Sequence, residues 1–319
     1  MTSSSVGAVP RVSVCVISYN HAAFIERALL SVAAQETPFP FEIVLADDCS
    51  TDGTKEIAEA TARQFSVPFR RLPRARNLGP KDNFLDLLAA ARGQYVAYLE
   101  GDDQWLTTSR LAEQVALLDA QPQVSGCFAR ARVADADDGA LGDYFEYHGR
   151  PVPAFEVGQA TAIAEGSTAP SCTQMFRREA VATIPAWYAR DASHQGLSVL
   201  LTERGPLRFI DKVWGQYRVH RGGIWSLASR ETKYAVDFEY ALALASDYEL
   251  TRRYPREIGR RLALTTVGLS KERLLAGKGA RSLLDLVRDL RPVVTAPMLR
   301  AMALTLPELT RLAVRKALA

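Results

Sequence analysis

The first half of this 319-residue chain predicts an α/β fold with a doubly wound, mostly parallel sheet. Two observations lead to this class. Short apolar runs at residues 12–19, 41–46 and 95–99 alternate with segments of helical periodicity, and such alternation is typical of parallel sheets. Each run is followed directly by polar residues. Because ligands bind at the carboxyl ends of the strands in such sheets, these polar residues predict a site.

The individual elements follow from local patterns. The strands expected in the first half are short β-branched or aromatic runs: residues 12–19, 41–46, 67–72 and 95–99. The helices expected between and after them repeat apolar residues at helical spacing: residues 24–32, 55–65, 81–92 and 109–119. Beyond them the pattern becomes irregular, with strands expected at 124–133, 171–176 and 209–217, a helix at 194–204, and loops with short strands over 134–157. From residue 229 onward the pattern is helical.

Composition places the chain among ordinary globular proteins, with 48% hydrophobic and 24% charged residues. The net charge of +3 conceals an asymmetry, because residues 251–319 carry fifteen Lys/Arg against five Asp/Glu. This basic segment is expected to face an anionic surface or partner. The four cysteines have no metal-ligand spacing, and residues 1–9 have no signal-peptide pattern. No apolar run is long enough to span a bilayer, so we expect a cytoplasmic protein.

An acidic cluster follows the apolar run at residues 95–99. Glu100, Asp102 and Asp103 lie within four positions, and such carboxylates repel one another unless a cation or a basic partner lies among them. Mg²⁺ or Mn²⁺ bound by carboxylates keeps open positions for phosphate oxygens. The cluster therefore predicts a divalent metal site. An acidic loop that only caps a helix is the alternative interpretation.

Four ordered motifs resemble those of inverting family 2 glycosyltransferases, which have the nucleotide-sugar-binding GT-A fold. The motifs are VCVISYN at 14–20, ADDCSTDGT at 46–54, EGDDQW at 100–105 and YRVH at 217–220. The resemblance covers residues 12–226, about two thirds of the chain. It implies a GT-A catalytic domain at 10–228 and leaves a basic helical C-terminal region at 229–319.

The resemblance also implies roles for residues of these motifs. In the family an Asp of the second motif bonds the base of the donor, which Asp47 or Asp48 would do here through a charge-assisted hydrogen bond. Asp102, within the Glu100-Gly101-Asp102 counterpart of the family's Asp-x-Asp motif, would bind the metal, with Glu100 and Asp103 directly or through water. Further donor contacts are expected from six residues: Ser18, Tyr19, Asn20, Arg76, Arg218 and Arg221. His220 is a further metal or diphosphate ligand, and Ser226 would help to close over the phosphates.

The general base is where this sequence departs from the family. An inverting transferase needs a base that accepts the proton of the acceptor hydroxyl. The family usually has an Asp at the start of a helix for this purpose, and His194 occupies that place here. Either His194 is the base, or Asp191 is the base or orients His194. A third possibility is that neither acts and the activity is altered or absent.

These observations predict a metal-dependent transferase that moves a sugar from a UDP- or dTDP-linked donor to a hydroxyl. The acceptor is a saccharide, a lipid-linked molecule or a small molecule, and no nucleic-acid partner is expected. The alternative is a nucleotide-sugar-binding protein with altered or no transferase activity. A phosphohydrolase would explain the acids but not the fourth motif. The basic, amphipathic segments at 281–288 and 309–318 predict either packing and dimer contacts or peripheral membrane association.

Overall fold

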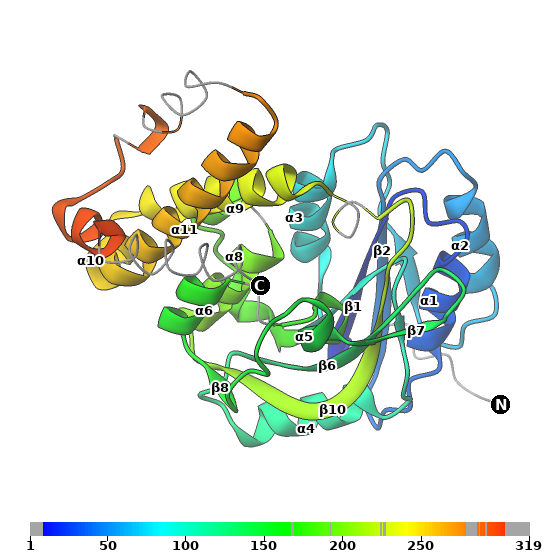
Figure 1. Cartoon of the computed structure of the whole chain (residues 1–319). Coiled ribbons are helices and arrows are strands. Elements are labelled where there is room, and N and C mark those ends of the chain that lie inside the picture. The colour runs from blue at the N-terminus through cyan, green and yellow to red at the C-terminus, as the bar shows by residue number, and fades with distance from the viewer. Residues whose placement is uncertain are drawn as a thin grey trace. The chain divides into compact units, whose positions relative to one another are not determined.

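The computed structural model describes residues 9–303 apart from 167–168, 192, 224, 226–227, 279–285, 287 and 291. The chain divides into two compact units (Figure 1). The first unit comprises Met1–Gly158, Ser167–Ile184 and Leu200–Gly222, and the second comprises Gln159–Gly166, Pro185–Val199 and Gly223–Ala319. The second unit therefore combines the C-terminal helices with two segments that precede residue 200. The predicted boundary at residue 228, which follows the extent of the resemblance, stays a prediction.

A ten-stranded sheet forms the first unit. Its strands are β1 (Val12–Ser18), β2 (Phe41–Asp47), β3 (Phe69–Arg71), β4 (Tyr95–Glu100), β5 (Gln104–Trp105), β6 (Gly126–Ala134), β7 (Ala140–Asp143), β8 (Glu156–Val157), β9 (Met175–Arg177) and β10 (Leu207–Arg218). The order along the sheet is β3-β2-β1-β4-β9-β6-β10-β5, with β7 on β6 and β8 on β10. The pairs β1–β2, β1–β4, β2–β3 and β6–β10 are parallel, whereas β9 is antiparallel to both neighbours. The pairs that β5, β7 and β8 make are antiparallel as well. The predicted α/β fold is therefore confirmed, but its sheet is mixed, with the three longest pairs parallel and most of the short pairs antiparallel.

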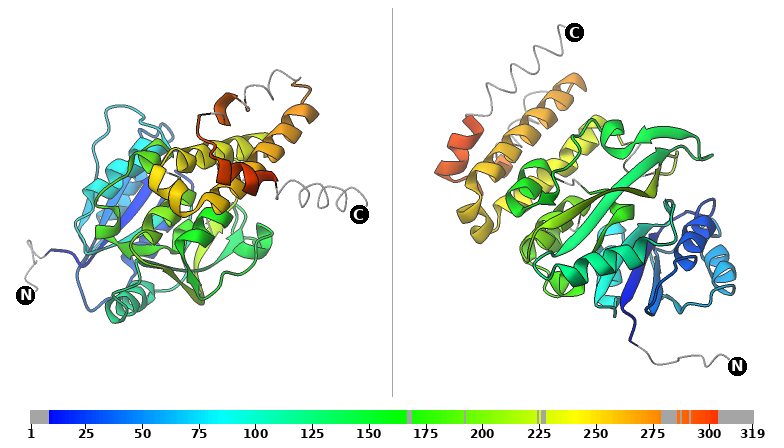
Figure 2. Two further views of the ribbon diagram at one scale, coloured as in Figure 1. Left: turned by 90° about the vertical axis from the view of Figure 1, so that its left-hand side faces the viewer. Right: turned by 90° about the horizontal axis from the view of Figure 1, so that it is seen from below.

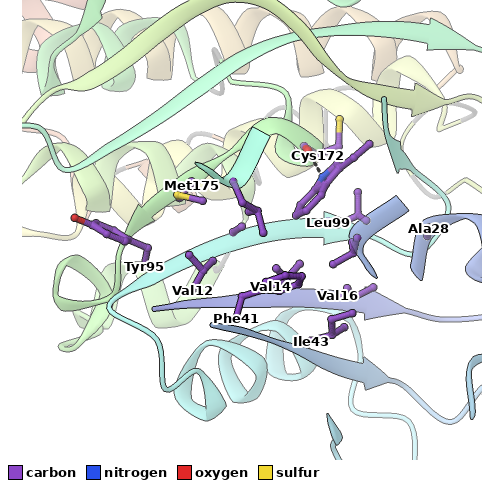
Figure 3. Packing of buried hydrophobic residues seen from close by; sticks show 14 of the residues in the cluster. Val12, Val14, Val16, Ala28, Phe41, Ile43, Tyr95, Leu99, Cys172 and Met175 are labelled. Carbon is purple, nitrogen blue, oxygen red and sulfur yellow. Dashed lines mark hydrogen bonds between the residues drawn. The ribbon is translucent and has the colours of Figure 1, made fainter. Parts of the chain in front are cut away.

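Helices cover both faces of this sheet. They are α1 (Ile25–Ala33), α2 (Thr54–Ala62), α3 (Pro80–Ala90), α4 (Arg110–Ala120) and the short α5 (Tyr144–Tyr147). Alternate residues of β1, namely Val12, Val14 and Val16, share one apolar cluster with side chains of α1, α2 and α4 (Figure 3). The intervening Cys15 faces α3, where its thiol lies 3.8 Å from the Leu87 carbonyl. Burial on both faces explains why β1 and β2 are almost continuously apolar.

The structure differs from the sequence prediction at residues 171–176. A 3₁₀ turn, η1 (Ser171–Thr173), replaces the first half of the expected strand, and β9 begins only at Met175. The cause is the buried guanidinium of Arg110, which donates to the carbonyls of Cys172 and Gln174 at 2.5 and 3.0 Å. A second turn, η2 (Arg178–Val181), follows β9. The region expected as loops and short strands, 134–157, contains the short strands β7 and β8 and, in addition, the short helix α5.

The second unit is helical. It contains α6 (Gln159–Glu165), α7 (Ala186–Asp191), the first part of α8 (His194–Thr202), α9 (Arg230–Ala245), α10 (Tyr248–Arg253) and α11 (Pro255–Leu275). Helices α9 and α11 pack side by side (Figure 2). Most of the predicted amphipathic segment 281–288 and all of 309–318 lie outside the described residues. In the described part of the chain, no helix combines the length and apolarity needed to cross a bilayer.

Candidate functional site

The loops that follow β1 and β2 are joined by hydrogen bonds at the carboxyl edge of the sheet. Asn20 has a left-handed backbone with φ of 55°, and its N–H donates to Ser50 Oγ at 2.8 Å. The N–H of Thr51 donates back to Asn20 Oδ1 at 2.9 Å, and the N–H of His21 donates to Thr54 Oγ1 at 2.8 Å. Two predicted motifs, 32 residues apart in the sequence, thus form one surface.

The two aspartates of the second motif already have partners within this loop surface. The Ser50 hydroxyl and N–H both donate to the carboxylate of Asp47. Asp48 accepts the N–H of Leu78 at 2.7 Å and of Gly79 at 2.9 Å, one on each oxygen. These two N–H groups lie just before α3, so Asp48 satisfies donors at the start of that helix. Both aspartates are nearly inaccessible to solvent.

The acidic loop after β4 joins the same edge. The N–H of Gly101 donates to the Ile17 carbonyl at 2.8 Å, which extends the β1–β4 pairing into the loop. Asp103 Oδ1 accepts the N–H of Arg218, at the end of β10, at 2.8 Å. The Arg218 guanidinium also donates to the backbone oxygen of Asp102. Motifs three and four are therefore held together by Arg218, through both its backbone and its side chain.

The buried side chain of Arg218 turns toward the protein. It donates to Asp138 Oδ1 at 2.6 Å and lies 5.0 Å above the ring of Phe24. Asp138 also accepts from Gln216 and forms an ion pair with Arg27. Asp138 has a positive φ of 68° in the turn before β7, a conformation that Asp tolerates better than most residues. Through these contacts within the protein, Arg218 stabilises the position of the acidic loop at residues 100–103.

Burial and mutual repulsion perturb the three carboxyl groups. Burial and the charge of Asp102 raise the pKa of Glu100 to about 8. Burial and the charges of Asp102 and Glu100 raise the pKa of Asp103 well above its usual value. Burial opposes the charged form of Asp102 as well, but a hydrogen bond with His220 and nearby imidazole charge outweigh it and lower that pKa. Asp102 is therefore the carboxylate that stays charged and available to a cation.

Three side chains could hold a metal ion at this edge. His21, Asp102 and His220 each offer one ligand atom, and these atoms all lie within 4.8 Å of one another. The group contains two of the four predicted ligands, Asp102 and His220. It adds His21 and does not include Glu100 or Asp103. Imidazole nitrogens with a carboxylate oxygen are a usual donor set for a divalent transition-metal ion, so the residues present fit such an ion.

The other predicted donor-binding residues differ in exposure. The side chains that face solvent are Tyr19, Asn20, Arg76 and Arg221, whereas Ser18 is buried at the end of β1. Solvent exposure leaves these four available to a ligand, and Tyr19 is 42% exposed despite its aromatic ring. Ser226 lies outside the described residues. The structure thus assembles motifs one to four as far as Gly222, where the first unit ends.

The two candidate bases lie at helix ends. Asp191 is the last residue of α7, and His194 is the first residue of α8. Their side chains lie outside what the structure describes. The Ser193 hydroxyl accepts the N–H of Gly196 at 3.1 Å and so caps the start of α8. His194 therefore occupies the first turn of α8.

Sequence reasoning missed three residues of this edge: His21, Phe24 and Asp138. His21 had a local signal, because it directly follows Asn20 in a strand-end loop. Phe24 reads as the apolar start of a helix, yet its ring lies 4.5 Å from that of His220. Asp138 lies 80 residues from Arg218 in a turn-like sequence, and no spacing rule connects the two.

Comparisons with known proteins agree with this fold. The family model described as Glycosyl transferase family 2 matches residues 13–184, more than half of the chain. The chain therefore belongs to glycosyltransferase family 2, as its motifs predicted. An uncharacterized protein of Mycobacterium tuberculosis is 34% identical over 223 residues, which are 68% of this chain and 61% of that protein. The abequosyltransferase RfbV of Salmonella typhimurium is 32% identical over 117 residues, 36% of this chain and 35% of that protein.

Two solved structures show the fold relationship. Staphylococcus aureus TarS 1–349, in complex with UDP-GlcNAc, has a TM-score of 0.62 at 20% identity and covers 90% of this chain and 82% of its own. The mannosyltransferase PcManGT of Pyrobaculum calidifontis, in complex with GDP-Man and Mn²⁺, has a TM-score of 0.54 at 17% identity, with 94% and 85% covered. The predicted GT-A fold is confirmed. The chain spans about three fifths of the length of its M. tuberculosis relative.

Proposed function

We propose that this chain is a metal-dependent, inverting glycosyltransferase. It transfers a sugar from a nucleoside diphosphate donor to an acceptor hydroxyl. The observation that carries the proposal is the meeting of Asp102 and His220 at the carboxyl edge of a family 2 fold, 2.9 Å apart between Oδ2 and Nε2. These two residues belong to different motifs and are 118 positions apart in the sequence, and together with His21 they could hold a metal ion.

A divalent ion held by Asp102 and His220 would neutralise the charge that develops on the leaving diphosphate. Residues of the chain itself would bind the nucleoside. The loops after β1 and β2, fixed to each other by Asn20, offer a rigid surface for the nucleoside. Of the two aspartates there, Asp48 is bonded on both oxygens to the start of α3. Asp47, whose contacts all come from one neighbouring residue, is the better candidate for the imide N–H of the base.

The reaction is a single displacement at the anomeric carbon. The acceptor oxygen forms a bond to that carbon while the bond from the carbon to the diphosphate oxygen breaks. The electron pair of the broken bond leaves with the nucleoside diphosphate, and the configuration inverts. His194 accepts the acceptor proton, with Asp191 as the alternative base. A neutral imidazole suits this role.

The donor and acceptor are proposed only by class. TarS was solved with UDP-GlcNAc and PcManGT with GDP-Man, so family neighbours of this fold accept different bases. We expect a UDP- or dTDP-linked donor, because an aspartate that accepts an imide N–H suits uracil and thymine. The acceptor carries a hydroxyl on a saccharide, a lipid-linked molecule or a small molecule. The basic C-terminal region would bring a lipid-linked acceptor into contact with an anionic membrane.

Calorimetric titration of UDP, dTDP and GDP, each with Mn²⁺ and with EDTA, tests the donor site. We expect Mn²⁺-dependent binding of UDP or dTDP to the wild type and its loss in Asp102→Ala. The matched control is Asp137→Ala, which removes an exposed carboxylate of the same unit. The absence of nucleotide binding under every condition would contradict the proposal.

The alternative function is a donor-binding protein without turnover, and the replacement of the family's usual base by His194 favours it. The two functions agree on donor binding and differ in catalysis. Release of nucleoside diphosphate from UDP- and dTDP-linked sugars, measured over a panel of hydroxyl acceptors, separates them. Acceptor-dependent release that falls in His194→Ala supports the transferase. Donor binding with no release for any acceptor supports the alternative.

A further inference from the structure

The first residue after Asn20 brings a second imidazole to the metal-binding edge. His21 Nε2 lies 3.6 Å from Asp102 Oδ2, on which His220 Nε2 also converges at 2.9 Å. The two imidazole rings meet edge to face, with their centroids 6.1 Å apart. All three side chains are mostly shielded, with exposed fractions of 14% for His21, 16% for Asp102 and 7% for His220.

The backbone around His21 determines where its ring lies. Its N–H donates to Thr54, and its carbonyl accepts the N–H groups of Phe24 and Ile25, both at 2.9 Å. Gly101 leaves the space that the ring occupies, because a Cβ at that position would lie 3.0 Å from His21 Nδ1. The imidazole is therefore seated beside Asp102 by its own backbone and by a glycine of the acidic motif.

His21 lies within ion-pair distance of Asp102 but makes no hydrogen bond to it. At 3.6 Å its Nε2 is too far from Asp102 Oδ2 for a hydrogen bond. Its Nδ1 is buried and has no hydrogen-bond partner among the described residues. Nearby, Ser18 Oγ is also buried without a partner and lies 3.0 Å from the same Cβ position at Gly101. Metal-bound histidines usually donate this second N–H to a carboxylate, a backbone carbonyl or a water molecule, and none of the described residues accepts one from His21 Nδ1.

The geometry points to His21 as a third protein ligand of the metal, beside Asp102 and His220. Two imidazoles and one carboxylate disfavour Mg²⁺, which takes oxygen ligands, and favour transition-metal ions. The site is thus expected to bind Co²⁺ more tightly than Mn²⁺, and Mn²⁺ more tightly than Mg²⁺. This inference rests on the proposed function only for the role of the ion, since the ligand set can be tested with metal alone.

Electron spin-echo spectroscopy of bound Mn²⁺ counts the coordinated imidazole nitrogens directly. We expect two imidazoles in the wild type, one each in His21→Ala and His220→Ala, and two in the control variant His148→Ala. Calorimetry should show Mn²⁺ binding weakened about 10-fold or more in His21→Ala, with Mg²⁺ binding changed much less. His21→Asp supplies an oxygen ligand instead, and it should reduce the preference for Mn²⁺ over Mg²⁺.

The count on the wild-type protein tests the inference even where a variant folds poorly, and His21→Asn offers a less disruptive change than alanine. A single imidazole in the wild type, or unchanged Mn²⁺ affinity in a folded His21→Ala, would overturn the role of His21. Mn²⁺-dependent UDP binding that survives such a result would leave the proposed function intact. Conversely, two coordinated imidazoles without binding of any nucleotide would contradict only the proposed function.

Discussion

The two units each contain a buried polar cluster, and the clusters differ in whether their positive and negative charges balance each other. In the first unit, Glu100, Asp102 and Asp103 share one edge of the sheet, where Arg218 is the cation that binds their loop. That guanidinium is also paired with Asp138, so the acids exceed the positive charge available to them. Burial first, and then the neighbouring negative charges, raise the pKa of Glu100 and of Asp103.

In the second unit, the positive and negative charges of the buried polar cluster compensate each other. Arg261 of α11 donates to Gln195 Oε1 in the first turn of α8, and it lies 3.8 Å from Asp237 of α9. Gln195 donates in turn to Asp237 Oδ1 at 2.6 Å, and the guanidinium lies 4.5 Å above the ring of Tyr240. Each charge here has an opposite charge or a dipole. The comparison suggests that uncompensated buried charge marks a ligand site, whereas compensated charge marks a structural joint.

Removal of Asp102 should have the largest effect, because it deletes the one carboxylate that stays charged in the unbalanced cluster. We expect Asp102→Ala to lower transferase activity about 1,000-fold or more, which corresponds to several kcal/mol of charge stabilisation by the metal. The measurement is the rate of nucleoside diphosphate release at saturating Mn²⁺. Asp137→Ala serves as the control, and a loss below about 10-fold in Asp102→Ala would break the proposed link between unbalanced charge and function.

Removal of the general base comes next. We expect His194→Ala to lower kcat about 100-fold with little change in Mn²⁺-dependent UDP affinity, because the proposed donor and metal contacts Asp47, Asp102 and His220 belong to the first unit. An imidazole base also predicts a rate that rises with pH across the range in which histidine loses its proton, whereas a carboxylate base gives a rate that is already flat there. Rates of Asp191→Ala and His148→Ala, measured in parallel, complete the test. A larger loss in Asp191→Ala would assign the base to that residue.

The sequence predicted the unbalanced cluster better than the balanced one, for a physical reason. Strand ends in a parallel sheet meet at one edge whatever the sequence between them, so polar residues after each strand predict a site. The acids at 100–103 were found in this way, whereas His220 was predicted only from the family resemblance of the fourth motif. His21 was missed because only the local turn at Asn20 and the space at Gly101 bring its ring over the site.

The second unit could not be predicted by the same reasoning. Its central contact joins Arg261 to Gln195, 66 residues away, and Arg261 also donates to the carbonyl of Ile163, 98 residues away. The pattern of α11 shows only that an arginine lies on a helix. Neither periodicity nor capping chemistry tells which distant helices it will contact, since helix packing is set by tertiary contacts.

For the charge-compensated cluster of Arg261, Asp237 and Gln195 we predict an effect on stability. Arg261→Met leaves Asp237 and Gln195 without their buried partner, so we expect the free energy of unfolding to fall by about 2–3 kcal/mol. Urea denaturation followed by circular dichroism measures this loss. Hydrogen exchange of the segment 194–199 should also accelerate, because Gln195 anchors the first turn of α8 to α9 and α11.

The neighbouring residue provides the control for this experiment. Arg260 is exposed on the same helix, so Arg260→Met should change stability by less than about 0.5 kcal/mol. Gly166→Ala offers a second probe, because a Cβ there would lie 2.8 Å from Arg261 Nη2 and the glycine has a φ of +77°. Equal stability of Arg260→Met and Arg261→Met would show that the cluster is not a structural joint.

The smallest effects are expected at two helix starts, one in each unit. The carboxylate of Asp48 accepts two backbone N–H groups at the start of α3, whereas the Ser229 hydroxyl accepts one, from Thr232 at 3.1 Å, at the start of α9. Asp48→Ala should therefore cost about 1–2 kcal/mol and Ser229→Ala about 0.5–1 kcal/mol in chemical denaturation. The order follows from burial as well, since Asp48 is 3% exposed and Ser229 faces solvent. If Asp48→Ala proved harmless to stability but reduced UDP affinity, Asp48 rather than Asp47 would be the aspartate that contacts the base. In that case the hydrogen bonds from Leu78 and Gly79 to Asp48 would contribute little to stability, and Asp48 would belong to the ligand site.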